Sequence, residues 1–206
     1  RYNQVISKND QTVNNNSVWS GLSRSSNRYS VDAFTFSNAN YGFENSVYSL
    51  TAELNSQFSS VVSNKLLVAW TSVRDQRTSN SDKFPFVDIW EGGTQYMSFG
   101  YELFSYNNDV QNKSLIITDN LTFALGDHTL VAGLSFEKQY VKNAYMRSPL
   151  SYYRYASVDD FINDRKPIGF SITYPYGEGD APGVELNFGM ASIYVQDEWR
   201  VNPEFK

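Results

Sequence analysis

Residues 115–140 read LIITDNLTFALGDHTLVAGLSFEKQY, two alternating runs separated by Gly126-Asp127. A glycine and an aspartate between two such runs predict a two-residue hairpin turn, which places Leu125 opposite His128. Three further pairs then face each other: Phe123 and Leu130, Leu121 and Ala132, and Ile117 and Phe136. The apolar residues of both runs share one face in this register, and a shift of one residue would separate them. The stretch therefore predicts an antiparallel hairpin with a defined register.

Similar alternation runs through residues 48–59 and 190–201. Residues 65–77 also predict a strand, but both of its faces are apolar between Leu66 and Trp70, so its orientation stays open. A strand of about 12 residues, tilted near 45°, spans roughly 28 Å, close to the thickness of a bilayer core. Strands of soluble proteins usually have about 5–6 residues. The lengths therefore favour strands that cross a membrane.

The connections between these strands alternate in length. Short turns are expected near residues 60–64, at Gly126-Asp127 and at Asn202-Pro203, and long polar segments at residues 5–45, 78–110 and 143–187. Outer-membrane barrels have short turns on the periplasmic side and long loops outside the cell. Within the long segments we expect a short helix at residues 158–163 and an extra strand near residues 29–36.

Composition narrows the class of protein. Aromatic residues make up 16% of the chain and charged residues 19%, whereas soluble domains carry about 25% charged residues. The sequence has no run of about 18 apolar residues, which excludes a transmembrane helix. There are no cysteines, so disulfides and thiolate metal sites are excluded, and a net charge of −5 gives no basic field for nucleic acid.

These patterns predict an all-β protein, specifically an antiparallel up-and-down transmembrane β-barrel segment. We expect a partial barrel of about five or six long strands with long extracellular loops, and residues 1–206 as part of a single barrel domain. The chain opens on Arg1 without a methionine or signal peptide and stops just after an expected turn. We therefore expect an internal piece of a longer protein.

Residues 191–201, ASIYVQDEWRV, followed by Asn202-Pro203, resemble a strand motif of TonB-dependent outer-membrane receptors. Residues 118–133 and 48–70 are similar to barrel hairpins of the same family. Residues 84–89 and 104–108 resemble its Bacteroidetes branch, whose members often carry a carboxypeptidase-regulatory-like domain at the N-terminus. The resemblance covers most of residues 46–206. The order and spacing of these motifs together are more specific for the family than any one motif.

The resemblance implies a 22-stranded barrel closed by a plug domain, located in the cell outer membrane of a Gram-negative bacterium. It implies partners in outer-membrane lipid and in the TonB complex, the latter through parts not present in this chain, as is the plug. Such a receptor imports a scarce ligand, here an iron chelate, vitamin, glycan or peptide. The alternative is a passive outer-membrane barrel, a surface adhesin, or a soluble β protein that binds through its loops.

Candidate ligand-binding residues gather in one long loop, where aromatic and arginine side chains offer anchors for recognition. They are Tyr145, Arg147, Tyr152, Tyr153, Arg154 and Tyr155. The competing interpretation is that these side chains pack within the loop. We expect no enzyme, because His128, the only histidine, lies beside a turn away from the long loops.

No metal or cofactor is expected. Carboxylates occur at Asp159, Asp160 and Asp164, and at Glu178 and Asp180, but their spacing fits no calcium loop, which favours solvated acids. Charges at Asp119, Lys138 and Asp197 fall on the face expected to meet lipid. Lys138 and Asp197 lie near strand ends, where a charge costs little, whereas the sequence offers no explanation for Asp119.

Overall fold

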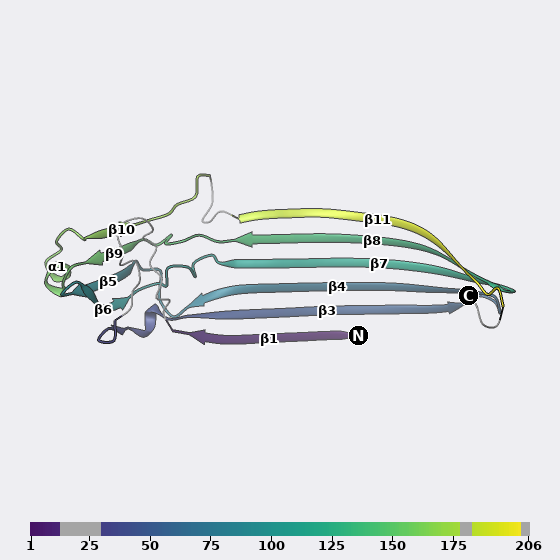
Figure 1. The fold of residues 1–206 in the computed structure, drawn as a ribbon, viewed down its shortest axis with the longest axis horizontal. Helices are drawn as coiled ribbons and strands as arrows, with labels where there is room; N and C mark the ends of the chain where they lie inside the picture. The colour runs from purple at the N-terminus through teal and green to yellow at the C-terminus, as the bar shows by residue number, and fades with distance from the viewer. Residues whose placement is uncertain (13–29, 178–182, 203–206) are drawn as a thin grey trace.

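The computed structural model describes residues 1–12, 30–177 and 183–202. Its strands form two sheets, which lie end to end (Figure 1). The long sheet has six strands in the order β1-β3-β4-β7-β8-β11, and the loop-end sheet has five in the order β10-β9-β5-β6-β2. The predicted all-β class is confirmed, and the long sheet is antiparallel throughout. No helix in the described part of the chain is long and apolar enough to cross a membrane.

The strands of the long sheet are longer than the sequence predicts. They are β1 (Tyr2–Gln11), β3 (Tyr41–Gln57), β4 (Val62–Ser79), β7 (Asp109–Leu125), β8 (His128–Ala144) and β11 (Gly183–Trp199). The loop-end sheet consists of β2 (Phe34–Thr35), β5 (Phe86–Glu91), β6 (Thr94–Phe99), β9 (Tyr152–Tyr155) and β10 (Gly169–Ser171). A 3-10 turn η1 (Ser37–Ala39) and a helix α1 (Val158–Ile162) lie beside it.

The predicted hairpin register is confirmed. Leu125 pairs with His128 and Ile117 with Phe136, and the ladder between β7 and β8 continues from there without interruption to Ala144. Gly126 has φ +65°, a conformation that costs little only for glycine, which explains a glycine at this turn.

Other boundaries differ from the sequence-based expectation. Residues 5–45 were expected to form a loop, but β1 occupies the start of this segment and pairs with β3. The residues of β1 near Asn9 are polar on both faces of the strand, so the sequence shows no alternation there. This part of the chain is extended because it pairs with β3. The short turn expected near residues 60–64 lies at residues 58–61, and the short helix at residues 158–163 is confirmed as α1. Pro203 of the expected turn Asn202-Pro203 lies outside the described residues. The extra strand expected near residues 29–36 is found only at Phe34–Thr35, as β2, and Tyr29 lies outside the described residues.

The register sorts the long sheet into two unlike faces. On one of them, here called the band face, apolar residues of neighbouring strands stand opposite each other over five rows, and a sixth row at the strand ends contains Leu125 and Trp199. Two of these rows are Ala52, Val68, Ile117, Phe136 and Ala191, and Leu54, Leu66, Asp119, Leu134 and Ile193. The pairing also orients β4, because it places Leu66, Val68 and Trp70 on the band face and Leu67 on the other.

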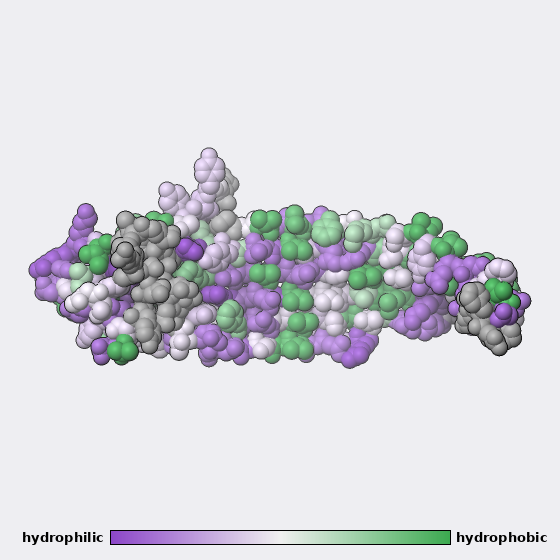
Figure 2. Space-filling view, viewed as in Figure 1, coloured by the Kyte–Doolittle hydropathy of each residue, from purple (hydrophilic) through white to green (hydrophobic). Residues whose placement is uncertain are grey.

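The opposite face, here called the polar face, carries hydrogen-bonding side chains behind the band. Lys65 and Glu53 form an ion pair at 3.1 Å, and the Tyr194 hydroxyl donates to Asn120 at 2.6 Å. The Tyr194 ring crosses Gly133, where an added Cβ would meet it at 2.2 Å. Figure 2 shows this face, where one line of hydrophobic residues crosses the strands in the half nearer the loop-end sheet. That line is Val5, Val47, Val73, Val141 and Leu186, interrupted at Asn112.

The hydrophobic core lies almost entirely at the loop end. Its two clusters centre on Phe86 and Tyr152 and on Val87, Ile89 and Tyr155. Among the buried hydrophobic residues of the described chain, only Ala144, the last residue of β8, belongs to the long sheet. By contrast, Leu134 and Ile193 of the band face are 55% and 78% exposed. Among the described residues, the long sheet therefore has no core of its own.

Candidate functional site

The loop-end sheet is assembled from three connections of the long sheet. β5 and β6 come from the connection between β4 and β7, and β9 and β10 from the connection between β8 and β11. They join because β5 pairs in parallel with β9, while β2, from a third segment, pairs in parallel with β6. The described parts of the predicted long loops therefore form a folded unit at one end of the long strands (Figure 1).

A buried ionic network lies at the centre of this unit. The Asp88 carboxylate is fully buried and accepts hydrogen bonds from Ser98 Oγ at 2.9 Å, Trp90 Nε1 at 3.0 Å and Tyr152 OH at 2.9 Å. Arg154 Nε donates to it at 3.1 Å, and the Arg154 guanidinium stacks over the Trp90 ring at 4.4 Å. A buried carboxylate with a cation and several donors is satisfied, so this network locks β5 to β9.

The six candidate ligand residues separate into two groups. Tyr152, Arg154 and Tyr155 are at most 8% exposed and pack within the core of the loop-end sheet. Burial among apolar side chains raises the pKa of Tyr155. Tyr145 and Arg147 are exposed, and Tyr153 is half-buried against Phe170. These three remain candidates for ligand contact, although none of them lines the aromatic groove described next.

An open aromatic groove on the same unit was not recognised from the sequence. It is a hollow of about 450 Å³ lined by Asn38, Asn80, Ser81, Asp82, Phe84 and Phe99. The rings of Phe84 and Phe99 stack at 6.2 Å, and Phe36 meets Phe99 edge-on at 5.9 Å. Aromatic walls with a few amides and a carboxylate are typical of ligand sites. The available signal was the repeated phenylalanine in residues 34–36 and 84–86, but those segments are 50 positions apart in the sequence.

The junction between the two sheets contains a second buried acid. Glu102 is 1% exposed, accepts from the Phe104 amide at 2.9 Å and from Ser105 Oγ at 2.5 Å, and lies 3.8 Å from Arg77 of β4. The Arg77 guanidinium also lies over the Tyr41 ring at 4.9 Å. These contacts connect the segment after β6 to the start of β3 and the end of β4, beside the loop-end sheet.

Of the five carboxylates considered as calcium ligands, two form ion pairs and two are not described. Asp159 and Asp160 pair with Arg165 at 3.0 and 3.1 Å. Glu178 and Asp180 lie outside the described residues. In the part of the chain that the structure describes, no three acids or histidines come together as metal ligands.

Two of the charges on the band face, Asp119 and Asp197, have partners that the sequence did not reveal. Asn64 of β4 donates to Asp119 at 2.7 Å, which gives the mid-strand carboxylate a polar neighbour on the same face. His128 Nδ1 lies 2.8 Å from Asp197, and the His128 ring stacks on Trp199 at 5.4 Å. His128 is therefore a strand-end residue paired across β8 and β11.

No protein-family model matches the chain, and no curated protein or solved structure is significantly similar to it.

Proposed function

We propose that this chain forms part of the wall of an outer-membrane β-barrel in a TonB-dependent receptor. The barrel imports a scarce ligand, which the loop-end sheet contacts first on the outside of the cell. The observation that carries the proposal is the division of the long sheet into an apolar band on one face and hydrogen-bonding side chains on the other. Lipid covers the band in this proposal, and the polar face lines the lumen.

The height of the band supports a membrane environment. On β7 it extends from Leu115 to Leu125, about 33 Å along the strand and about 23 Å across a bilayer for a strand tilted by 45°. Outer-membrane barrels expose an apolar band about 25 Å tall. Each strand continues past the band toward the loop-end sheet, where the band face becomes charged with Lys8, Glu44 and Arg74.

The absence of a core beneath the long sheet in the described residues also supports the proposal. Exposed apolar area of this extent marks an interface with a partner or a membrane. β1 and β11 each have one neighbour in the sheet, and every residue of the 17-residue β11 is exposed. An unpaired edge does not persist in lipid, so further strands of the same barrel must pair with both edges.

Site-directed spin labelling tests the orientation of the sheet. The chain has no cysteine of its own, so a spin label attached to one introduced cysteine reports on that position alone within this chain. In outer-membrane vesicles that contain the full-length receptor, labels at Leu121→Cys and Leu134→Cys are expected to collide with oxygen, which partitions into lipid. Labels one residue away, at Thr122→Cys and Ser135→Cys, are expected to collide with a water-soluble nickel chelate. The proposal is contradicted if the band-face labels are as accessible to the chelate as the polar-face labels. If the band-face labels are shielded from both reagents, the sheet packs in a soluble sandwich.

Growth assays test import. Strains that lack either the receptor gene or TonB are compared on a limiting ferric siderophore, cobalamin, oligosaccharide or oligopeptide. Both strains are expected to fail on the same nutrient. Growth that depends on the receptor but not on TonB indicates a passive barrel, and growth that depends on neither favours an adhesin.

The aromatic groove is the proposed first contact with the ligand. Phe84→Ala is expected to raise the nutrient concentration needed for half-maximal uptake, because it removes one of the stacked rings. Tyr174→Ala, at an exposed aromatic outside the groove, is the matched control. Equal effects of the two substitutions exclude the groove.

A further inference from the structure

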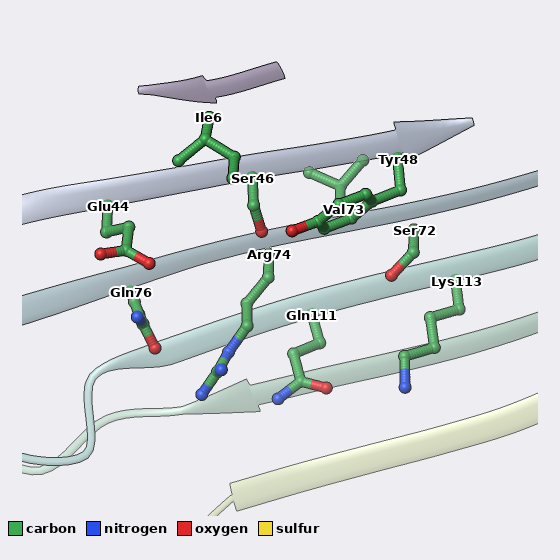
Figure 3. A pocket seen from close by; sticks show the side chains of 10 residues that line it. All are labelled: Ile6, Glu44, Ser46, Tyr48, Ser72, Val73, Arg74, Gln76, Gln111 and Lys113. Atoms are coloured by element: carbon green, nitrogen blue, oxygen red, sulfur yellow. The ribbon is translucent and has the colours of Figure 1, made fainter. Parts of the chain in front are cut away.

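A polar pocket lies on the band face just beyond the apolar band, toward the loop-end sheet. It has a volume of about 350 Å³, and side chains from β1, β3, β4 and β7 converge on it (Figure 3). Its lining is mainly polar: Glu44, Ser46, Tyr48, Ser72, Arg74, Gln76, Gln111 and Lys113, with Ile6 and Val73. The register explains the position of the pocket. The first row of residues beyond the band, toward the loop-end sheet, contains Tyr48, Ser72 and Lys113, and the next row contains Ser46, Arg74 and Gln111.

The charge of this region is positive once its ion pairs are matched. Lys8 pairs with Glu44 at 3.0 Å, Arg74 with Asp109 at 2.7 Å, and Lys142 with Glu185 at 3.5 Å. Lys113 remains, with its ammonium over the Tyr140 ring at 5.5 Å and no carboxylate within ion-pair distance among the described residues.

A second lysine lies beside it. Lys138 pairs with Leu115 in the row of the band nearest the loop-end sheet. Among the described residues, no carboxylate lies within ion-pair distance of Lys138 either. Because Lys113 stands opposite Tyr140, Lys113 and Lys138 are diagonal neighbours on β7 and β8, about 7–8 Å apart at their Cα atoms. Two lysines at this spacing, at the edge of the apolar band nearer the loop-end sheet, are placed to hold one anionic group between them. This also gives a reason for a lysine at a position that faces lipid.

We propose that this region binds the phosphorylated saccharide headgroup of a glycolipid of the outer leaflet. Lys113 and Lys138 pair with its phosphate, and its acyl chains lie along the apolar band. The amides of Gln76 and Gln111 and the hydroxyls of Ser46, Ser72 and Tyr48 offer partners for sugar hydroxyls, which a simple phosphodiester headgroup does not have. The proposal depends on the proposed function, because it requires the band face to meet lipid.

Native mass spectrometry of the delipidated full-length receptor tests it with three probes: diphosphoryl lipid A, phosphatidylglycerol and glucose 6-phosphate. The wild type is expected to bind lipid A at least tenfold more tightly than either other probe. The exposed double variant Lys113→Gln/Lys138→Gln is expected to lose at least fivefold in affinity for lipid A. Lys113→Arg/Lys138→Arg should retain the affinity, and Lys65→Gln on the polar face is the matched control.

Three results overturn the inference: equal affinity for lipid A and phosphatidylglycerol, equal affinity for lipid A and glucose 6-phosphate, or an unaltered double variant. The spin-label experiment separates these failures from failure of the proposed function. If the band labels contact lipid and lipid A shows no preference, only the headgroup site is wrong. If the band labels contact water, the barrel wall itself is wrong and the headgroup site falls with it.

Discussion

The buried Asp88 network yields the sharpest stability prediction. Asp88→Ala removes the carboxylate that accepts from Ser98, Trp90, Tyr152 and Arg154, all within 3.1 Å. It leaves the Arg154 guanidinium, 6% exposed, without its buried counter-charge. Breaking a buried ion pair by removing one partner costs about 3–5 kcal/mol. At the lower limit, about 3 kcal/mol corresponds to a change of roughly 150-fold in the local opening equilibrium.

Hydrogen exchange followed by mass spectrometry measures that opening in the full-length protein. Peptides covering β5 and β9 are expected to exchange roughly 100-fold faster in Asp88→Ala than in the wild type, because local opening limits their exchange. Peptides from the β7–β8 hairpin should be unchanged, since the network does not reach them. Asp82→Ala, at an exposed acid of the same connection, is the matched control.

The double variant Asp88→Leu/Arg154→Met separates a lost ion pair from a lost packing site. Replacing both charges with apolar groups removes the unpaired charge, so the double variant should exchange more slowly than Asp88→Ala alone. If Asp88→Ala accelerates exchange less than about tenfold, or if the double variant is the less protected of the two, the buried pair does not hold β5 against β9.

Three further predictions concern single positions. Gly133→Ala places a methyl group against the Tyr194 ring and is expected to lower the free energy of unfolding by about 1–3 kcal/mol, measured by thermal melting in detergent. An unchanged stability would show that the Tyr194 ring does not lie over Gly133. Asp119→Leu alone leaves Asn64 on the band face without its acceptor, so the double variant Asp119→Leu/Asn64→Leu should melt higher than Asp119→Leu, and the opposite order would contradict the pairing. Burial raises the pKa of Tyr155 above its ordinary value near 10, so its stabilising contribution is complete below pH 10 and is lost as pH rises through the folded-state pKa. Tyr155→Phe should therefore make exchange in β9 less sensitive to alkali, and equal alkaline sensitivity in both proteins would assign the loss to other groups.

Much of the long sheet could be predicted because its determinants are local. Alternation with a period of two assigns a face to each residue of a strand, and the glycine at position 126 fixes the turn that aligns β7 with β8. The hairpin register was therefore correct at every predicted pair. Strand ends were less certain, because beyond the band both faces are polar and the alternation no longer distinguishes strand from loop.

The orientation of β4 required the neighbouring strands. Leu66 to Trp70 is apolar on both faces, so the sequence by itself gave no preference, and pairing with β3 and β7 assigned Leu66 and Trp70 to the band face. The loop-end sheet required the tertiary structure throughout. Parallel pairing of β5 with β9 joins residues more than 60 positions apart, and local sequence carries no signal for a pair at that distance.

The sequence by itself determined the strand class, the hairpin and the two unlike faces, because periodic patterns are set by neighbouring residues. The tertiary structure alone decided which polar residues are buried. Asp88 in the middle of an apolar segment reads as a loop residue, and Arg154 reads as a surface anchor, until the fold brings them within 3.1 Å. A buried charge is tolerated only where a distant partner satisfies it, and the position of that partner is a property of the fold.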